Sequence, residues 1–172
     1  MADAFLENEE DLEEDTQKGK YMIFRSGEEF YGLELRYVNE IIQIQPITAV
    51  PEVEDYMKGL INLRGKIIPV IDVRLRFKQE PIEYNDRTCI IIINVNGTIV
   101  GLIVETIADV VNIDEKDIEP PPSLSSNVGK NKYVYGLGKT GDSVKLLLDP
   151  EKLIGTAELA GLEQLAAEES EE

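Results

Sequence analysis

The sequence contains no histidine, only one cysteine, and 17 basic residues against 34 acidic ones. Without histidine, the chain lacks the commonest general base, the commonest zinc ligand and the side chain that titrates near neutral pH. The single cysteine, Cys89, allows no internal disulfide bond and opens the apolar run C-I-I-I-I, where we expect a packed small side chain rather than a nucleophile. These absences argue against a zinc site and against histidine- or cysteine-dependent catalysis.

Long apolar segments are also missing. No apolar run approaches the roughly 20 residues that span a bilayer. The N-terminus is acidic, whereas a secretory signal begins with positive charge and continues with an apolar middle. We therefore expect a soluble cytoplasmic protein with no direct membrane insertion.

The acidic residues gather at the two ends of the chain. Residues 1–17 hold eight acids and no base, residues 156–172 hold six acids and no base, and the rest carries a net charge of only −3. We expect an acidic disordered leader over 1–19 and a flexible acidic tail over 156–172 that is able to form a helix. The nearly neutral body lacks the basic field that favours nucleic acid as a partner.

The sequence between these tails predicts a mainly β structure. Asn96-Gly97 between Thr88–Val95 and Thr98–Val104 is the clearest hairpin signal, because both residues tolerate the positive φ of a type I′ turn. Further strands are expected at Tyr21–Phe24, Glu29–Leu35, Lys132–Leu137 and Ser143–Leu148. Short helices are expected at Val53–Met57 and after Asp149.

The stretch from Gly59 to Arg74, G-L-I-N-L-R-G-K-I-I-P-V-I-D-V-R, organises the body. Its apolar residues fit buried strands, and Arg64 lies beside a glycine in an expected turn. Asp72 and Arg74 alternate with apolar residues, which predicts a half-exposed strand. Arg64 is either a salt-bridged structural residue or a recognition residue.

An internal repeat is visible along the chain. The pattern G-L-x-L-x-x-V-x-E-I-I from Gly32 returns as G-L-x-V-x-x-I-x-D-V-V from Gly101, 69 residues later, and a second block returns at a shift of 77. Each copy has about five strand signals, which favours a small barrel over an open sheet. We expect barrel subdomains at 20–80 and 81–155, with strands allowed to cross between them and apolar surface shared along their junction.

No motif supports an enzyme. Gly138-Lys139-Thr140 resembles the end of a phosphate-binding loop, but Tyr133 stands where the motif needs glycine, and a strand follows in place of a helix. Asp114, Glu115 and Asp117 lack the glycine and the downstream glutamate of a calcium loop. We expect no cofactor and no metal; a small-barrel nucleic-acid-binding protein is the alternative to a protein-binding module.

Several motifs together resemble CheW-type chemotaxis coupling proteins. They are the Gly59–Arg74 stretch, F-Y-G-L-E-L-R-Y-V-N-E-I-I from Phe30, Y-N-D-R-T from Tyr84 and Y-V-Y-G-L-G from Tyr133, within a resemblance running from about Lys20 to Leu153. The resemblance implies two five-stranded SH3-like barrels packed side by side. It further implies a non-catalytic scaffold that couples the cytoplasmic tip of methyl-accepting chemotaxis receptors to the regulatory domain of the histidine kinase CheA, in receptor arrays under the inner membrane. A CheW-like domain of a CheV-type protein or of a kinase is the alternative within the family.

The resemblance implies five protein-binding residues. Val38 and Ile107 match apolar positions linked to receptor or kinase contact, and their equivalence in the repeat suggests that they face one groove; the alternative is ordinary core. Glu40 matches an acidic binding position or is a solvated charge. Gly59 matches a position of close backbone approach or is a turn glycine. Arg64 matches the arginine of the family's N-L-R-G motif.

Overall fold

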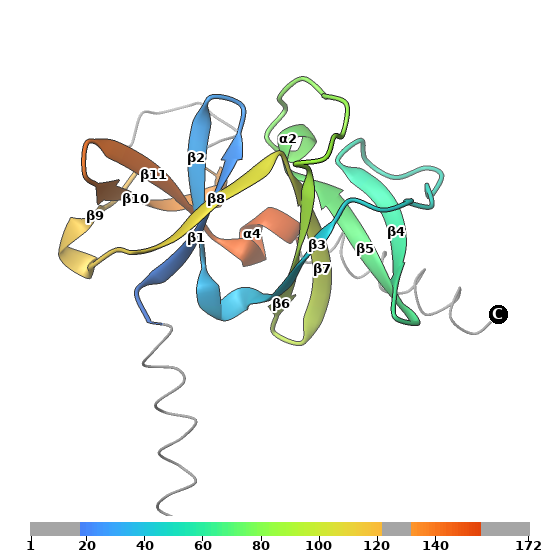
Figure 1. Cartoon of the computed structure of the whole chain (residues 1–172), viewed down its shortest axis with the longest axis horizontal. Helices are drawn as coiled ribbons and strands as arrows, with labels where there is room; N and C mark the ends of the chain where they lie inside the picture. Colours follow the sequence, from blue (N-terminus) through green and yellow to red (C-terminus); the bar gives the residue numbers. More distant parts are fainter. Residues whose placement is uncertain (1–17, 122–131, 156–172) are drawn as a thin grey trace, which may run out of the picture.

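The computed structural model describes residues 18–121 and 132–155; the expectations for 1–17 and 156–172 lie outside the described residues. The described chain is mainly β, with two sheets side by side (Figure 1). Its first half contributes β1 (Lys20–Ser26), β2 (Glu29–Glu34), β3 (Val38–Gln43), β4 (Met57–Leu63) and β5 (Lys66–Asp72). Its second half contributes β6 (Cys89–Val95), β7 (Thr98–Val104), β8 (Thr106–Asn112), β9 (Ile118–Glu119), β10 (Val134–Thr140) and β11 (Ser143–Leu148). The helical segments are η1 (Leu35–Tyr37), α2 (Val73–Arg76), η2 (Glu115–Asp117) and α4 (Pro150–Ile154).

The six-stranded sheet has the order β8-β1-β2-β11-β10-β9, and the five-stranded sheet has the order β3-β6-β7-β5-β4. Neighbouring strands are antiparallel except for two parallel pairs, β2 with β11 and β5 with β7. The predicted mainly β class is confirmed. The strand ladders do not close into complete barrels, and one sheet holds six strands rather than five.

The two sheets exchange strands. β3 follows β2 in the chain but pairs with β6, and β8 follows β7 but pairs with β1. Each sheet therefore combines the first two strands of one repeat copy with the later strands of the other. Each sheet contains strands from both sides of the expected boundary between residues 80 and 81, and strand crossing of this kind was expected. The division into subdomains 20–80 and 81–155 stays a prediction.

Equivalent irregularities confirm the internal repeat. The pairing of β3 with β6 skips Asn39, and the pairing of β8 with β1 skips the equivalent Ala108. A second pair of bulges skips Lys58 in β4 and the equivalent Tyr135 in β10. Bulges bend a strand and increase its twist, so both copies bend at the same places.

One predicted turn and one predicted helix start are confirmed. Asn96 and Gly97 join β6 to β7 with φ angles of 54° and 88°, in the left-handed region that a type I′ turn requires. The Asp149 side chain accepts hydrogen bonds from the amides of Glu151 and Lys152, so it caps the N-terminus of α4.

Two local predictions are wrong. The expected helix at Val53–Met57 is absent, because Met57 belongs to β4, and ladder bonds with β5 outweigh a single helical turn. Asp72 and Arg74 do not alternate along a half-exposed strand. Asp72 is only 4% exposed, and its carboxylate accepts hydrogen bonds from the amides of Arg74 and Leu75, which starts α2.

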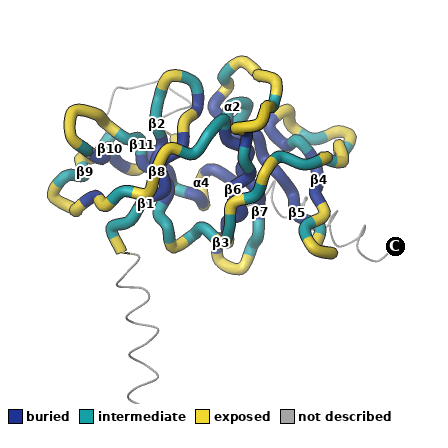
Figure 2. The backbone as a smooth tube through the Cα atoms, viewed as in Figure 1, coloured by how far each residue is buried: buried dark blue, intermediate teal, exposed yellow. Residues whose placement is uncertain are grey.

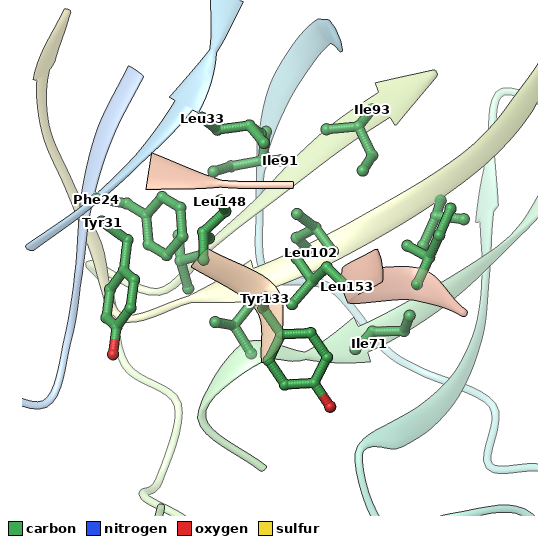
Figure 3. Close-up of a cluster of buried hydrophobic side chains, with 14 of the residues drawn as sticks. Phe24, Tyr31, Leu33, Ile71, Ile91, Ile93, Leu102, Tyr133, Leu148 and Leu153 are labelled. Atoms are coloured by element: carbon green, nitrogen blue, oxygen red, sulfur yellow. The ribbon is translucent and has the colours of Figure 1, made fainter. Parts of the chain in front are cut away.

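The largest apolar cluster lies between the sheets, and we call it the inter-sheet core. It includes Phe24 and Leu33 from the six-stranded sheet and Ile71 and Leu102 from the five-stranded sheet (Figure 3). Buried backbone accordingly runs through the middle of the molecule in Figure 2. A smaller cluster lies on the other face of each sheet. The expectation that the two modules share apolar surface is confirmed.

Candidate protein-binding site

The candidate site is centred on the turn between β4 and β5. Arg64 and Gly65 form this turn with φ angles of 52° and 88°. The Gly65 amide donates to Asn62 Oδ1 at 2.9 Å, which holds the turn together. The turn presents the Arg64 side chain at the surface, where 71% of it is exposed.

Arg64 forms an ion pair with Glu40 of β3. The distance from Arg64 Nη2 to Glu40 Oε2 is 2.6 Å, and the Glu40 side chain is 33% exposed. An ion pair this exposed contributes at most about 1 kcal/mol to folding, because water and salt screen it. Its location is more informative than its strength, since β3 and β4 are the two edge strands of the five-stranded sheet.

The five-stranded sheet is rolled so that these two edges approach each other. The chain leaving β3 forms an isolated antiparallel bridge with β4, in which Thr48 and Leu60 exchange two backbone hydrogen bonds of 2.8 and 2.9 Å. The Glu40–Arg64 ion pair joins the same two edges. This sheet therefore has the curvature of a small barrel without a continuous closing ladder.

Gly59 lies inside β4, next to this bridge, and not in a turn. Its φ is +143°, and a Cβ atom at this position would lie 2.0 Å from the carbonyl oxygen of Thr48. Only glycine permits this approach of two backbones. The predicted close backbone approach is therefore present, although it is made by the chain's own Thr48; a role in partner binding stays a prediction.

Val38 and Ile107 occupy equivalent places in the two sheets. Val38 pairs with Ile93 across β3 and β6, and Ile107 pairs with Phe24 across β8 and β1. Both side chains are half-buried and pack against the inter-sheet core. The structure thus brings them to the same core from two edge strands.

Sequence reasoning missed two exposed apolar residues on these edge strands. Ile41 of β3 is 41% exposed and Val110 of β8 is 44% exposed, and the two are equivalent in the repeat. Each follows the acidic residue of the repeat pattern, Glu40 or Asp109, and this shared position is the signal that could have identified them. Exposed aliphatic side chains beside charged ones are typical of protein-binding surfaces.

The second copy of the repeat lacks the ion pair. Asp109 stands at the position of Glu40, but its carboxylate accepts a hydrogen bond from the Val110 amide at 2.7 Å. The turn between β10 and β11 has Gly141 where the first copy has Arg64. The two sheets therefore share their bends but differ in this one charged pair.

The described residues offer little that is typical of a reaction centre. Within 18–121 and 132–155, no group of three or more histidine, cysteine or acidic side chains is placed to hold a metal ion. Burial raises the pKa of the Cys89 thiol, which disfavours the reactive thiolate. None of the described helices is long and apolar enough to cross a membrane. What the site does offer is an exposed cation paired with a carboxylate, with an exposed aliphatic side chain, Ile41, on the same edge strand as the carboxylate.

Comparison with known proteins agrees with the sequence motifs. The CheW-like domain family matches residues 20–158. The chemotaxis protein CheW of Klebsiella aerogenes is 33% identical over 152 residues, which cover 88% of this chain and 91% of that protein. CheW of Treponema pallidum is 33% identical over 146 residues, which cover 83% and 85%. The crystal structure of the scaffolding protein TtCheW from Thermoanaerobacter tengcongensis superposes with a TM-score of 0.74 at 37% identity, covering 80% of this chain and 93% of that one. The chain therefore belongs to the CheW-like domain family.

Proposed function

We propose that this chain is a non-catalytic scaffold that couples chemoreceptors to the histidine kinase CheA in bacterial chemotaxis. Membership of the CheW-like family supports the scaffold role. The chain binds the regulatory domain of CheA and the cytoplasmic tip of methyl-accepting receptors in this proposal. It works in the cytoplasm, at receptor arrays. The nucleic-acid-binding alternative gains no support from the family match.

The difference between the two repeat copies carries the proposal for the binding site. If the Glu40–Arg64 ion pair were required to roll a sheet, the second copy would need an equivalent. The second copy bends at the same residues with Asp109 and Gly141 at these positions. The ion pair is therefore dispensable for the architecture, which favours recognition as the reason for Arg64.

We assign Val38, Glu40, Gly59, Arg64 and Ile107 to protein binding. Arg64 contacts the partner, and Glu40 holds its guanidinium in place. Gly59 acts indirectly, because it lets the Thr48 segment lie against β4, the strand that leads into the Arg64 turn. We also assign to binding the exposed Ile41 and Val110, which lie on the same edge strands as Val38 and Ile107.

Binding measurements on Arg64→Ala test this proposal. We expect a loss of about 1–3 kcal/mol in binding to a receptor cytoplasmic fragment or to CheA, which is roughly a 5- to 150-fold rise in Kd. The melting temperature should stay close to that of the unaltered protein, because the ion pair is exposed. Isothermal titration with each partner separately gives both the Kd and the partner that Arg64 contacts.

Arg36→Ala is the matched control. Arg36 forms an ion pair with Glu34 at 2.7 Å, with side chains 65% and 27% exposed, so its removal deletes the same kind of interaction elsewhere. We expect little change in Kd for this variant. Absence of binding by the unaltered protein to both partners overturns the scaffold proposal. Unfolding of Arg64→Ala with normal binding of the remaining folded fraction shows that Arg64 is structural.

A further inference from the structure

Arg76, at the end of α2, lies where the two repeat copies meet. Its guanidinium carbon is 4.2 Å from the ring centre of Tyr56 and 5.0 Å from that of Tyr133. These tyrosines are equivalent in the repeat, and their carbonyl oxygens accept equivalent hydrogen bonds from the amides of Asp72 and Asp149. A single guanidinium therefore makes cation–π contacts with two equivalent rings, one from each copy.

Arg76 also joins the two short helices that follow the last strands of the copies. Its Nε donates to the carbonyl oxygen of Leu153 in α4 at 2.7 Å. α2 follows β5 of the five-stranded sheet and α4 follows β11 of the six-stranded sheet. Figure 1 shows α4 near the middle of the molecule, between the sheets. The bond thus crosses from one sheet to the other at the junction.

Glu105 and Asn96 also make polar contacts between the sheets. Glu105, the single residue between β7 and β8, accepts from Arg74 Nη1 at 3.0 Å and from the Gly27 amide at 2.5 Å. In the other copy, Asn96 donates to Glu151 at 2.8 Å. Both contacts tie the first turn of a short helix to a hairpin turn of the opposite sheet. Arg76 makes the one of these contacts that lies between the equivalent rings of Tyr56 and Tyr133.

The apolar contacts of the inter-sheet core also cross the junction. Apolar burial is non-directional, whereas hydrogen bonds and cation–ring contacts depend on angle. The guanidinium plane suits this position because it stacks on a ring and donates in its own plane at once. The directional contacts therefore restrict the angle between the two sheets more tightly than apolar packing alone does.

We propose that Arg76 is a positioning residue that fixes the angle between the two sheets, so that one scaffold engages two partners together. This inference rests on the proposed function, because only a protein with two simultaneous partners needs the angle. Simultaneous binding is lost when the geometry of two sites does not match their partners, even if each site binds well alone. Arg76 itself touches neither partner.

The angle is measurable without any partner. Spin labels at Lys66→Cys in β5 of the five-stranded sheet and at Asp142→Cys in the β10–β11 turn of the six-stranded sheet, with Cys89→Ser, report the distance between the sheets in the full chain. We expect one narrow distance distribution, and a shifted or broadened one after Arg76→Met, which keeps an unbranched stem but loses the cation and the donor. Lys132→Met is the matched control, because Lys132 Nζ lies 5.7 Å from the same Tyr133 ring without joining the two sheets. An unchanged distribution in Arg76→Met overturns the inference.

Simultaneous binding of CheA and a receptor fragment is measured next, in protein without spin labels. For Arg76→Met, we expect each separate Kd, for CheA and for a receptor fragment, to change by less than about twofold, while assembly of all three components falls by about threefold or more. Three-component assembly at the unaltered level overturns the positioning role even if the distance changes. Lack of binding to either partner by the unaltered protein refutes the proposed function instead, so the two failures are distinguishable.

Discussion

Replacing Gly59 by alanine tests how the five-stranded sheet is closed. The new Cβ would lie 2.0 Å from the Thr48 carbonyl oxygen, closer than any non-bonded contact allows, so one backbone must move. Forcing an L-residue into this sparsely populated region of positive φ adds about 1–3 kcal/mol. Displacing Thr48 also removes its two hydrogen bonds with Leu60, at about 1 kcal/mol each. We expect the free energy of unfolding to fall by about 3–5 kcal/mol, a large part of a typical 5–15 kcal/mol.

Gly65→Ala is the control for backbone conformation alone. Gly65 has a φ of +88°, but nothing lies within 4 Å of the position of its Cβ. Urea unfolding at 25 °C should therefore show a loss of only about 1–2 kcal/mol for Gly65→Ala. Hydrogen exchange should accelerate at the Thr48 and Leu60 amides in Gly59→Ala only. Equal losses in the two variants, or unchanged exchange at these amides, would refute the view that the Thr48 segment closes the sheet.

Two further predictions concern equivalent caps and alkaline pH. Asp72→Ala should cost about 2–4 kcal/mol and Asp149→Ala about 1 kcal/mol by urea unfolding, because Asp72 caps its helix and also accepts a hydrogen bond of 2.7 Å from the Tyr84 hydroxyl. Burial raises the pKa of Tyr31 and, with help from Asp72, that of Tyr84 above the ordinary value near 10. The folded state then binds more protons than the unfolded state above about pH 10, so the urea midpoint should fall as pH rises through this range, and less steeply in Tyr84→Phe.

The sequence predicted most of the hairpin strands and the repeat but not how the copies combine. β3 and β8 carry similar patterns, so nothing local tells β3 to pair with β6 rather than with β1. The choice depends on the crossovers, which are only the three residues of η1 and the single residue Glu105. Links this short favour pairing with the neighbouring copy, and this is a property of the whole arrangement.

The start of α2 was predictable in principle. Asp149-Pro150 was correctly expected to open a helix, and Asp72 is its equivalent at a shift of 77. The alternation of Asp72 and Arg74 with apolar residues favoured a strand instead, because a four-residue helix has too little periodicity to show. The Glu40–Arg64 contact joins residues at opposite edges of a sheet, so only the rolled sheet brings them together.

The exchange of strands has a consequence for the isolated halves of this chain. A polypeptide cut between α2 and β6 would leave each fragment with four strands that have lost a neighbour to the other fragment. A free-standing single unit would complete its sheets only by swapping strands with a twin. In this respect the chain resembles a strand-swapped dimer contained in one polypeptide, and its folding must join distant segments before either sheet is complete.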